Sequence, residues 1–230
     1  MPDNGASQIP LELPHQAALT RADLIVSAAN STAISAIDAW PDWPGPVFVL
    51  AGPVGSGKSH IGKVWCQTSS AISLAANGLA SEFSNLATHL ADGGSILLED
   101  AGKGEFDENV LFHLLNSIRE GGGSCLITSR SWPGEWDVQL PDLASRLRAA
   151  QLVELEEPDD DLLRQVMVKL FADRQLVVDP KLVDYCVMRM ERSLESVGKL
   201  VREIDRDALA RQSGITRSMA AKALERLGLG

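Results

Sequence analysis

One eight-residue segment limits what this chain can fold into more than any other. Residues 52–59 read Gly-Pro-Val-Gly-Ser-Gly-Lys-Ser and match the G-x-x-x-x-G-K-[ST] pattern of a phosphate-binding loop, or P-loop. The apolar run 47–51 predicts the buried strand that must precede such a loop, and a helix is expected from about residue 58. Glycines let backbone amides approach an anion, and a helix N-terminus favours negative charge. The segment therefore predicts an α/β fold and a bound nucleotide.

The residues of this loop have separate expected roles. Lys58 is expected to reach the β- and γ-phosphates, and the Ser59 hydroxyl is expected to coordinate Mg²⁺. The simpler interpretation is a glycine-rich turn that happens to contain a lysine. The nucleotide interpretation, with ADP or ATP as the ligand, assigns the whole loop to the binding site: Gly52, Pro53, Val54, Gly55, Ser56, Gly57, Lys58 and Ser59.

Composition narrows the class of protein. The chain has 230 residues and a net charge of −10, with no apolar run of the length needed to cross a membrane and no signal-peptide pattern. Its three cysteines form no C-x-x-C pair, which favours a reducing, cytoplasmic compartment over a disulfide or zinc framework. Residues 1–158 carry 8 basic and 19 acidic side chains. Such an acidic surface argues against direct sequence-specific DNA binding.

Apolar runs and helical periodicity alternate along the first two thirds of the chain and predict a doubly wound parallel sheet. After Pro158 only helical patterns remain, beginning with an acidic helix start at 159–161. We therefore expect an N-terminal segment over 1–20, an α/β domain over 21–157 and a small all-helical domain over 158–230. The expected strands are 47–51, 71–75, 95–100, 124–129 and 151–155. A helical run is expected within 23–39, and further helices are expected at 58–68, 79–91, 109–120, 142–147, 160–174, 180–190, 193–212 and 216–227.

Polar residues end two of the predicted strands at the edge where ligands bind in α/β sheets. Glu99 and Asp100 follow the run 95–98 and are expected to hold Mg²⁺ and to orient an attacking water. Thr128 ends the next strand and is expected to contact the γ-phosphate or that water. The alternatives are a solvated carboxylate pair that caps a strand and a threonine whose hydroxyl bonds a neighbouring loop.

Two further features of the sequence do not indicate a function when each is taken alone. Arg146 lies in a short predicted helix and, taken alone, is a solvated arginine. The N-terminal segment places a glutamine amide, at Gln8, before the apolar residues Leu11 and Leu13. Pro10 and Pro14 lower the cost of ordering this segment. Such a peptide can dock in an extended form in a hydrophobic groove.

Together these motifs resemble the DnaA/Hda branch of the AAA+ ATPases over residues 20–230. The segment 23–26, with Ile25, is similar to the part of that branch that encloses adenine, and His60 follows the P-loop as in its G-K-[ST]-H motif. Residues 97–100 resemble Walker B, and 126–129 resemble sensor 1, with Arg130 where the initiator usually has Asp. Residues 143–147 resemble the segment with the arginine finger, which would be Arg146.

The resemblance favours the regulatory, Hda-like members over the initiator, because nothing after the helical region resembles a DNA-binding domain. It implies that Gln8, Leu11 and Leu13 bind the DNA polymerase sliding clamp (β subunit). Arg146 would then act in trans on DnaA-bound ATP, as a negative regulator of replication initiation, and homo-oligomers are possible. Glu195 or Ser196 stands where the sensor 2 arginine belongs, with Arg192 one turn away, which predicts weak hydrolysis by the chain itself. The alternatives are an autonomous AAA+ ATPase acting as a loader and a non-catalytic DnaA-like targeting adaptor.

Overall fold

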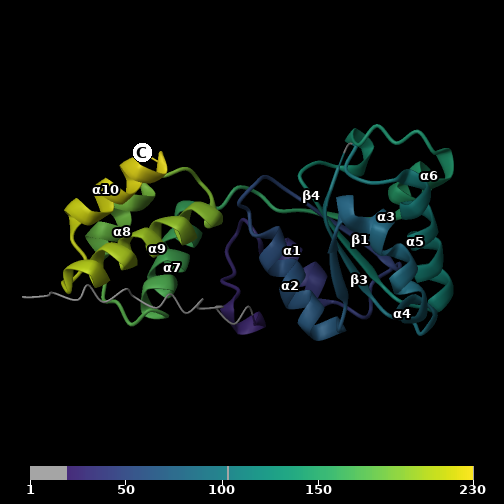
Figure 1. Cartoon of the computed structure of the whole chain (residues 1–230), viewed down its shortest axis with the longest axis horizontal. Helices are drawn as coiled ribbons and strands as arrows, with labels where there is room; N and C mark the ends of the chain where they lie inside the picture. Colours follow the sequence, from purple (N-terminus) through teal and green to yellow (C-terminus); the bar gives the residue numbers. More distant parts are fainter. Residues whose placement is uncertain (1–19, 103, 230) are drawn as a thin grey trace, which may run out of the picture.

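The structure is a computed structural model that describes residues 20–102 and 104–229. An α/β domain and a helical domain lie side by side along the long axis of the molecule (Figure 1). The predicted clamp-binding residues Gln8, Leu11 and Leu13 lie outside the described residues.

The α/β domain is built on one parallel sheet, as predicted. Its five strands follow the spatial order β2-β3-β4-β1-β5, and every neighbouring pair runs parallel. The strands are β1 (Val47–Ala51), β2 (Ile72–Ala75), β3 (Ile96–Ala101), β4 (Cys125–Ser129) and β5 (Gln151–Glu154). Strands β1, β3 and β4 are almost wholly buried, because helices cover both faces of the sheet.

The two faces of the sheet carry separate apolar clusters. On one face, α1 (Ser31–Asp38) and α2 (Lys58–Ser69) bury Ile34 and Trp65 against Phe48 of β1. On the other face, α5 (Glu108–Gly121) and α6 (Pro141–Ala149) bury their leucines against β3 and β4. Figure 1 shows α1 and α2 on one side of the strands, and α5 and α6 on the other side.

One helix prediction is wrong in extent. The expected helix 79–91 is divided into α3 (Leu79–Glu82), a 3₁₀ segment (Phe83–Leu86) and α4 (Ala87–Ala91). Side chains compete with the helical backbone there: the Ser81 hydroxyl donates to the Gly78 carbonyl at 2.8 Å. The helical run expected within 23–39 is α1, which begins at Ser31 because the Asn30 side chain donates to Ile25 O (2.9 Å) and accepts from Ser27 N (2.8 Å). These bonds hold residues 25–30 in a turn.

The helical domain consists of four helices around its own apolar core. They are α7 (Asp160–Ala172), α8 (Pro180–Val187), α9 (Leu194–Arg211) and α10 (Arg217–Leu227). Each begins after a residue whose side chain accepts a backbone N–H of the first turn: Asp159, Asp179, Ser193 and Thr216. Within the described ranges, no helix is both long enough and apolar enough to cross a membrane.

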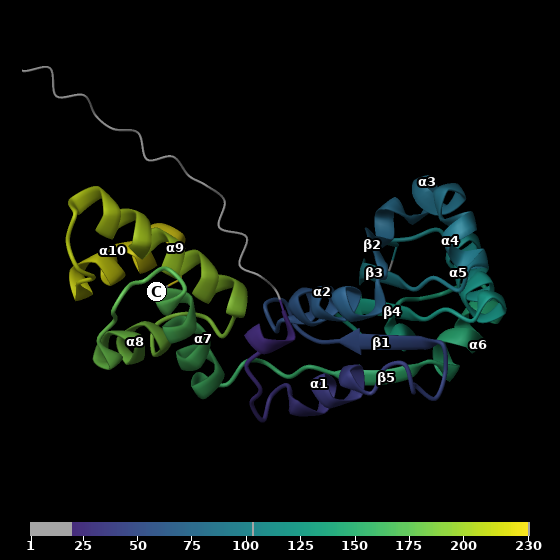
Figure 2. The ribbon, with the colours of Figure 1, turned by 90° about the horizontal axis from the view of Figure 1, so that it is seen from below.

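The helical domain contacts the α/β domain at the end of the sheet where β1 leads into α2 (Figures 1 and 2). The amide of Leu194, at the start of α9, donates to the Gly55 carbonyl at 2.8 Å. The Lys169 ammonium of α7 lies 2.9 Å from the Asp23 carboxylate. Both contacts are beside the P-loop, so the candidate site lies between the domains.

Candidate functional site

The P-loop adopts a backbone that glycine permits at two critical points. Gly55 and Gly57 have φ values of +77° and +101°, in the left-handed region that side chains disfavour. A Cβ atom on Gly57 would lie 3.1 Å from Leu194 Cδ1 of the helical domain. Gly57 is also the N-cap of α2, so the loop turns directly into the helix at Lys58. The first amides of α2 have no partner within the helix and remain available to an anion.

Lys58 is held inside the loop. Its side chain is only 7% exposed, and its ammonium donates to the carbonyl oxygens of Gly52 and Pro53, each at 2.7 Å. Burial lowers the pKa of Lys58, and the nearby carboxylate of Asp100 opposes that shift. A buried cation at the base of the loop is the charge that a phosphate group requires.

Ser56 and Ser59 provide two hydroxyl groups with different surroundings. Ser56 is 3% exposed, and its Oγ has no hydrogen-bond partner among the residues that the structure describes. An orphaned buried hydroxyl is costly in a folded protein, and an acceptor from a ligand would remove that cost. Ser59 is exposed on the first turn of α2 and lines the cavity. The loop residues therefore fit a phosphate group with an associated Mg²⁺ ion.

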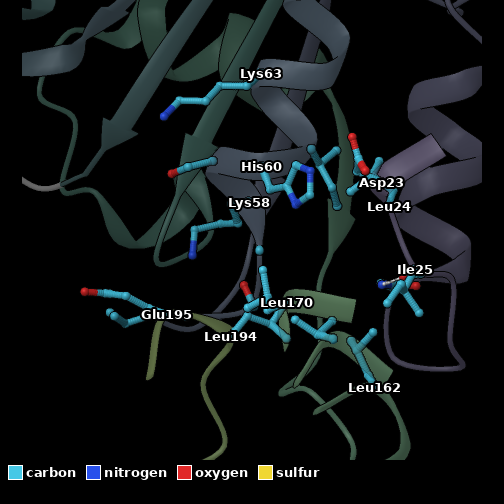
Figure 3. Close-up of a pocket in the computed structure, with 18 of the residues that line it drawn as sticks. Asp23, Leu24, Ile25, Lys58, His60, Lys63, Leu162, Leu170, Leu194 and Glu195 are labelled. Atoms are coloured by element: carbon cyan, nitrogen blue, oxygen red, sulfur yellow. Dashed lines mark hydrogen bonds between the residues drawn. The ribbon is translucent and has the colours of Figure 1, made fainter. Parts of the chain in front are cut away.

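A cavity of about 620 Å³ extends from the P-loop into the space between the domains. Leu24 and Ile25 line it from the N-terminal side, and His60 lines it from α2. The helical domain adds the apolar side chains Leu162 and Leu170 opposite them (Figure 3). Apolar walls on both sides of a narrow space suit a flat base, so the structure brings the predicted residues Ile25 and His60 into one pocket with the P-loop.

His60 is partly buried in this wall. Its Nε2 atom is buried and has no hydrogen-bond partner in the described part of the chain. Burial lowers the pKa of His60, while the carboxylate of Asp23 acts in the opposite direction. Figure 3 shows the imidazole between Lys58 and Asp23. The uncharged ring thus separates the phosphate side of the cavity from its apolar side.

Of the predicted carboxylate pair, only Asp100 lines the P-loop cavity. Its carboxylate is 3.8 Å from Arg130 Nε. Glu99 accepts a hydrogen bond of 2.9 Å from Ser73 Oγ of β2 and, together with Asp100, lines a neighbouring cavity of about 410 Å³. Asp100 has a φ of +56°, at an irregularity in the β3–β4 register. The bend turns Asp100 toward the P-loop, which makes it the better placed of the two to hold Mg²⁺.

Thr128 supports Asp100 and does not line the P-loop cavity. It is 1% exposed, and its Oγ1 accepts a hydrogen bond of 3.1 Å from the Asp100 amide. This contact matches the alternative interpretation of Thr128, in which its hydroxyl bonds a neighbouring segment at the end of the strand. Thr128 would therefore act on a bound nucleotide through the backbone of Asp100.

Cationic residues that the sequence analysis did not assign to the site also line the cavity. They include Arg130 from the segment after β4, Lys169 from α7 and Arg202 from α9. Arg192 instead forms an ion pair of 3.1 Å with Asp160. Glu195 lines the cavity, and Arg202 follows it by seven residues, two helical turns, on the same face of α9. In the sequence, this seven-residue spacing is the feature that could have identified Arg202 as a residue of the site.

Arg146 lies away from the chain's own P-loop cavity. Helix α6 is at the end of the α/β domain opposite the helical domain (Figures 1 and 2), and Arg146 lines neither cavity. Its guanidinium carbon is 5.1 Å from the centre of the Phe112 ring. Arg146 forms no hydrogen bond or ion pair with other described residues. Any phosphate that this arginine contacts must belong to another nucleotide site.

Comparisons with known proteins bear on the fold. No family model matches the chain. An uncharacterised protein of Haemophilus influenzae is 24% identical over 191 residues, covering 78% of this chain and 81% of that protein. Domain III of the Thermotoga maritima replication initiation protein DnaA superposes with a TM-score of 0.78 at 16% identity, covering 90% of this chain and 96% of the domain.

Two other solved structures share the arrangement. AMPPCP-bound DnaA from Aquifex aeolicus has a TM-score of 0.67 at 18% identity, covering 79% of this chain and 63% of DnaA. The Thermotoga maritima RuvB Holliday junction branch migration motor has a TM-score of 0.70 at 14% identity, covering 88% of this chain and 70% of RuvB. The fold expected from the sequence is therefore confirmed: the chain has the DnaA-like AAA+ fold, a five-stranded parallel sheet with flanking helices followed by a helical region.

Proposed function

We propose that this chain is a nucleotide-binding regulator of replication initiation. It would hold ADP or ATP between its two domains and promote hydrolysis of ATP bound to DnaA, by inserting Arg146 into the nucleotide site of that partner. One observation carries the proposal: Arg146 lies on a AAA+ domain but lines neither cavity of its own chain. An arginine in that position would be available to the nucleotide site of a neighbouring molecule.

The arrangement of the cavity supports nucleotide binding. The P-loop amides and Lys58 would hold the phosphates, and Ile25 and His60 would enclose the base. Ser59 and Asp100 would hold Mg²⁺, which neutralises charge on the phosphate oxygens. A nucleotide that contacts both domains would stabilise the folded arrangement in proportion to its concentration over Kd.

The role of Arg146 in trans follows from the chemistry of phosphoryl transfer. Negative charge is spread over the equatorial oxygens of the transferred group, and an arginine finger that reaches them raises the rate by about 10³–10⁵. Hydrolysis by the chain itself is expected to be weak. Glu99 is hydrogen-bonded by Ser73 and does not line the P-loop cavity. The chain would therefore act mainly on the nucleotide of its partner.

Attachment to the sliding clamp would bring the chain to DNA without a DNA-binding surface of its own. This part of the proposal rests on the sequence pattern formed by Gln8, Leu11 and Leu13. An extended peptide of this kind loses little entropy on docking when prolines flank it. Clamp binding would also raise the local concentration of the chain near DnaA on the same DNA.

The test is the release of phosphate from ATP pre-bound to DnaA, in the presence of clamp-loaded DNA and this chain. Arg146→Ala is expected to reduce the stimulated rate at least 100-fold, and Gln8→Ala is expected to require more protein for the same rate. Arg148→Ala is the matched control, because Arg148 is exposed on the same helix. If Arg146→Ala stimulates like the wild type, the chain is a targeting adaptor. If DnaA keeps its ATP while this chain hydrolyses ATP rapidly alone, it is an autonomous ATPase.

A further inference from the structure

Helix α5 fixes the beginning of α6 through Glu108. The Glu108 carboxylate accepts hydrogen bonds from the Gln139 amide at 2.9 and 3.1 Å and from the Leu140 amide at 2.7 Å. Leu140 is the N-cap residue of α6 and has no capping side chain of its own. Because a carboxylate that accepts backbone N–H groups forms charge-assisted bonds, Glu108 sets where α6 begins.

Phe112 contacts α6 from the next turn of the same face of α5, four residues after Glu108. Its ring centre lies 5.1 Å from the guanidinium carbon of Arg146, within the range of a cation–π interaction. The ring itself packs against the apolar cluster that contains Leu143 and Leu147 of α6. The ring is thus held by the core on one side and faces the arginine on the other.

The surroundings of the Arg146 side chain support a specific role for the Phe112 ring. The Nε atom of Arg146 is buried and has no hydrogen-bond partner within the described part of the chain. Leaving a buried donor unpaired has a cost, so the packing that covers it must offset that cost. Neighbouring Arg148 is exposed and makes no ring contact in the same described part. Of the two arginines of α6, Arg146 therefore contacts Phe112 and Arg148 does not.

We infer that Phe112 is a positioning residue for Arg146, with Glu108 as the anchor of the helix that carries it. The inference rests on the proposed function of Arg146 in trans. A free arginine side chain samples many rotamers, and only a few of them direct the guanidinium at a phosphate of a partner. The Phe112 ring restricts those rotamers before the partner binds, so that less freedom is lost when the composite site forms.

The experiment uses the full chain in the DnaA–ATP hydrolysis assay on clamp-loaded DNA, with the protein concentration varied. Phe112→Leu keeps an apolar side chain but removes the ring. We expect it to lower the maximal stimulated rate about fivefold, with the half-saturating concentration unchanged. Phe112→Tyr retains a ring and is expected to remain within about twofold of the wild type. Because both residues act through one guanidinium, Phe112→Leu combined with Arg146→Ala should be no slower than Arg146→Ala alone.

A purely structural role for Phe112 would give a different pattern: an unchanged maximal rate in Phe112→Leu, or a raised half-saturating concentration with lower thermal stability. Either result overturns the inference. If Arg146→Ala abolishes stimulation and Phe112→Leu is normal, only the positioning role fails. If Arg146→Ala stimulates like the wild type, the proposed function fails as well.

A second measurement needs no partner. The Arg146 Nε–H signal in an NMR spectrum should be shifted by the ring current of Phe112 in the wild type. The signal should move in Phe112→Leu and stay in place in Phe112→Tyr. Arg148 provides the internal control, and its signal should be the same in all three proteins. An Arg146 signal that is unchanged in Phe112→Leu contradicts the contact and the inference.

Discussion

The amide nitrogen of Leu194 donates a hydrogen bond to the carbonyl oxygen of Gly55 over 2.8 Å. Leu194 is the first residue of α9 in the helical domain, and Gly55 is in the P-loop. The two domains are therefore joined at the backbone of the phosphate-binding loop itself. A ligand that orders the P-loop would also order the surface on which the helical domain docks, so we expect nucleotide binding to be coupled to the arrangement of the domains.

A substitution at Gly55 would test the contact between the P-loop and the helical domain. A Cβ atom at position 55 would overlap the Ser193 hydroxyl and lie 2.7 Å from Ser193 Cβ, and the φ of +77° disfavours any side chain. We expect Gly55→Ala to lower the free energy of unfolding of the nucleotide-free protein by about 1–3 kcal/mol in urea titrations. Gly45→Ala is the control, because a Cβ there meets nothing within 4 Å. Equal stability of the two variants would show that the domains do not meet at Gly55.

Ser56→Ala is expected to change stability and ligand binding in opposite directions. The Ser56 Oγ is buried without a partner among the described residues, so its removal should raise the unfolding free energy of the nucleotide-free protein by about 0.5–1 kcal/mol. The same change removes a hydroxyl from the phosphate site and should weaken ADP binding several-fold. Urea titration and calorimetric titration with Mg²⁺–ADP measure the two effects. A loss of stability without ligand would mean that Ser56 has a structural partner.

The ion pair between Asp23 and Lys169 predicts a pH dependence. Hydrogen bonds from Lys169, and then from Thr20, hold the pKa of Asp23 well below its usual value of about 4. A depressed carboxyl pKa stabilises the folded state above about pH 4, and this contribution is lost as the pH falls through the lower, folded-state pKa. Asp23→Asn should therefore lower the unfolding free energy by about 1 kcal/mol at pH 7. The difference from the wild type should shrink steadily below pH 4.

The control for this pair is Asp173→Asn. Asp173 also contacts Lys169, at 2.8 Å, but it is the C-cap residue of α7 itself, so its loss leaves the interdomain contact in place. Limited proteolysis at pH 7 should show faster cleavage between the domains in Asp23→Asn than in Asp173→Asn. Identical cleavage rates for the two variants would mean that the pair does not hold the domains together.

The three cysteines are expected to react slowly in the folded protein. Burial raises the pKa of Cys125 to about 12, and of Cys66 and Cys186 to about 11. Because the thiolate is the reactive form, little of it is present at pH 8. Iodoacetamide followed by mass spectrometry should label Cys66, the least buried, first and Cys125 last, with all three labelled quickly in urea. Rapid labelling of Cys125 in the native protein would contradict its burial.

Prediction from the sequence succeeded where the signal is local. Buried parallel strands are apolar runs, which explains why β1, β3 and β4 were predicted to within about one residue of their observed bounds. The predicted acidic helix start at 159–161 was also confirmed, since the Asp159 carboxylate accepts from the Leu162 amide at 2.7 Å. A capping residue acts within one turn of its own helix, so its effect can be read from neighbouring residues.

The sequence did not indicate the backbone irregularity near the end of β3. Glu99 and Asp100 were both predicted to hold Mg²⁺, and in the structure only Asp100 lines the P-loop cavity. Strand alternation places successive side chains on opposite faces, and the positive φ of Asp100 changes that pattern at the last step. The positive φ of Asp100 has no signature in the residues themselves.

The sequence by itself determined the P-loop, the parallel sheet and the change to an all-helical region, because each follows from residue types within a few positions of one another. Only the tertiary structure decided that Arg202 and not Arg192 lines the cavity, that Leu194 meets Gly55, and that Phe112 faces Arg146. These relationships join residues far apart in the chain. They depend on how each helix is rotated and where it packs, and those are set by the apolar clusters that all the elements form together.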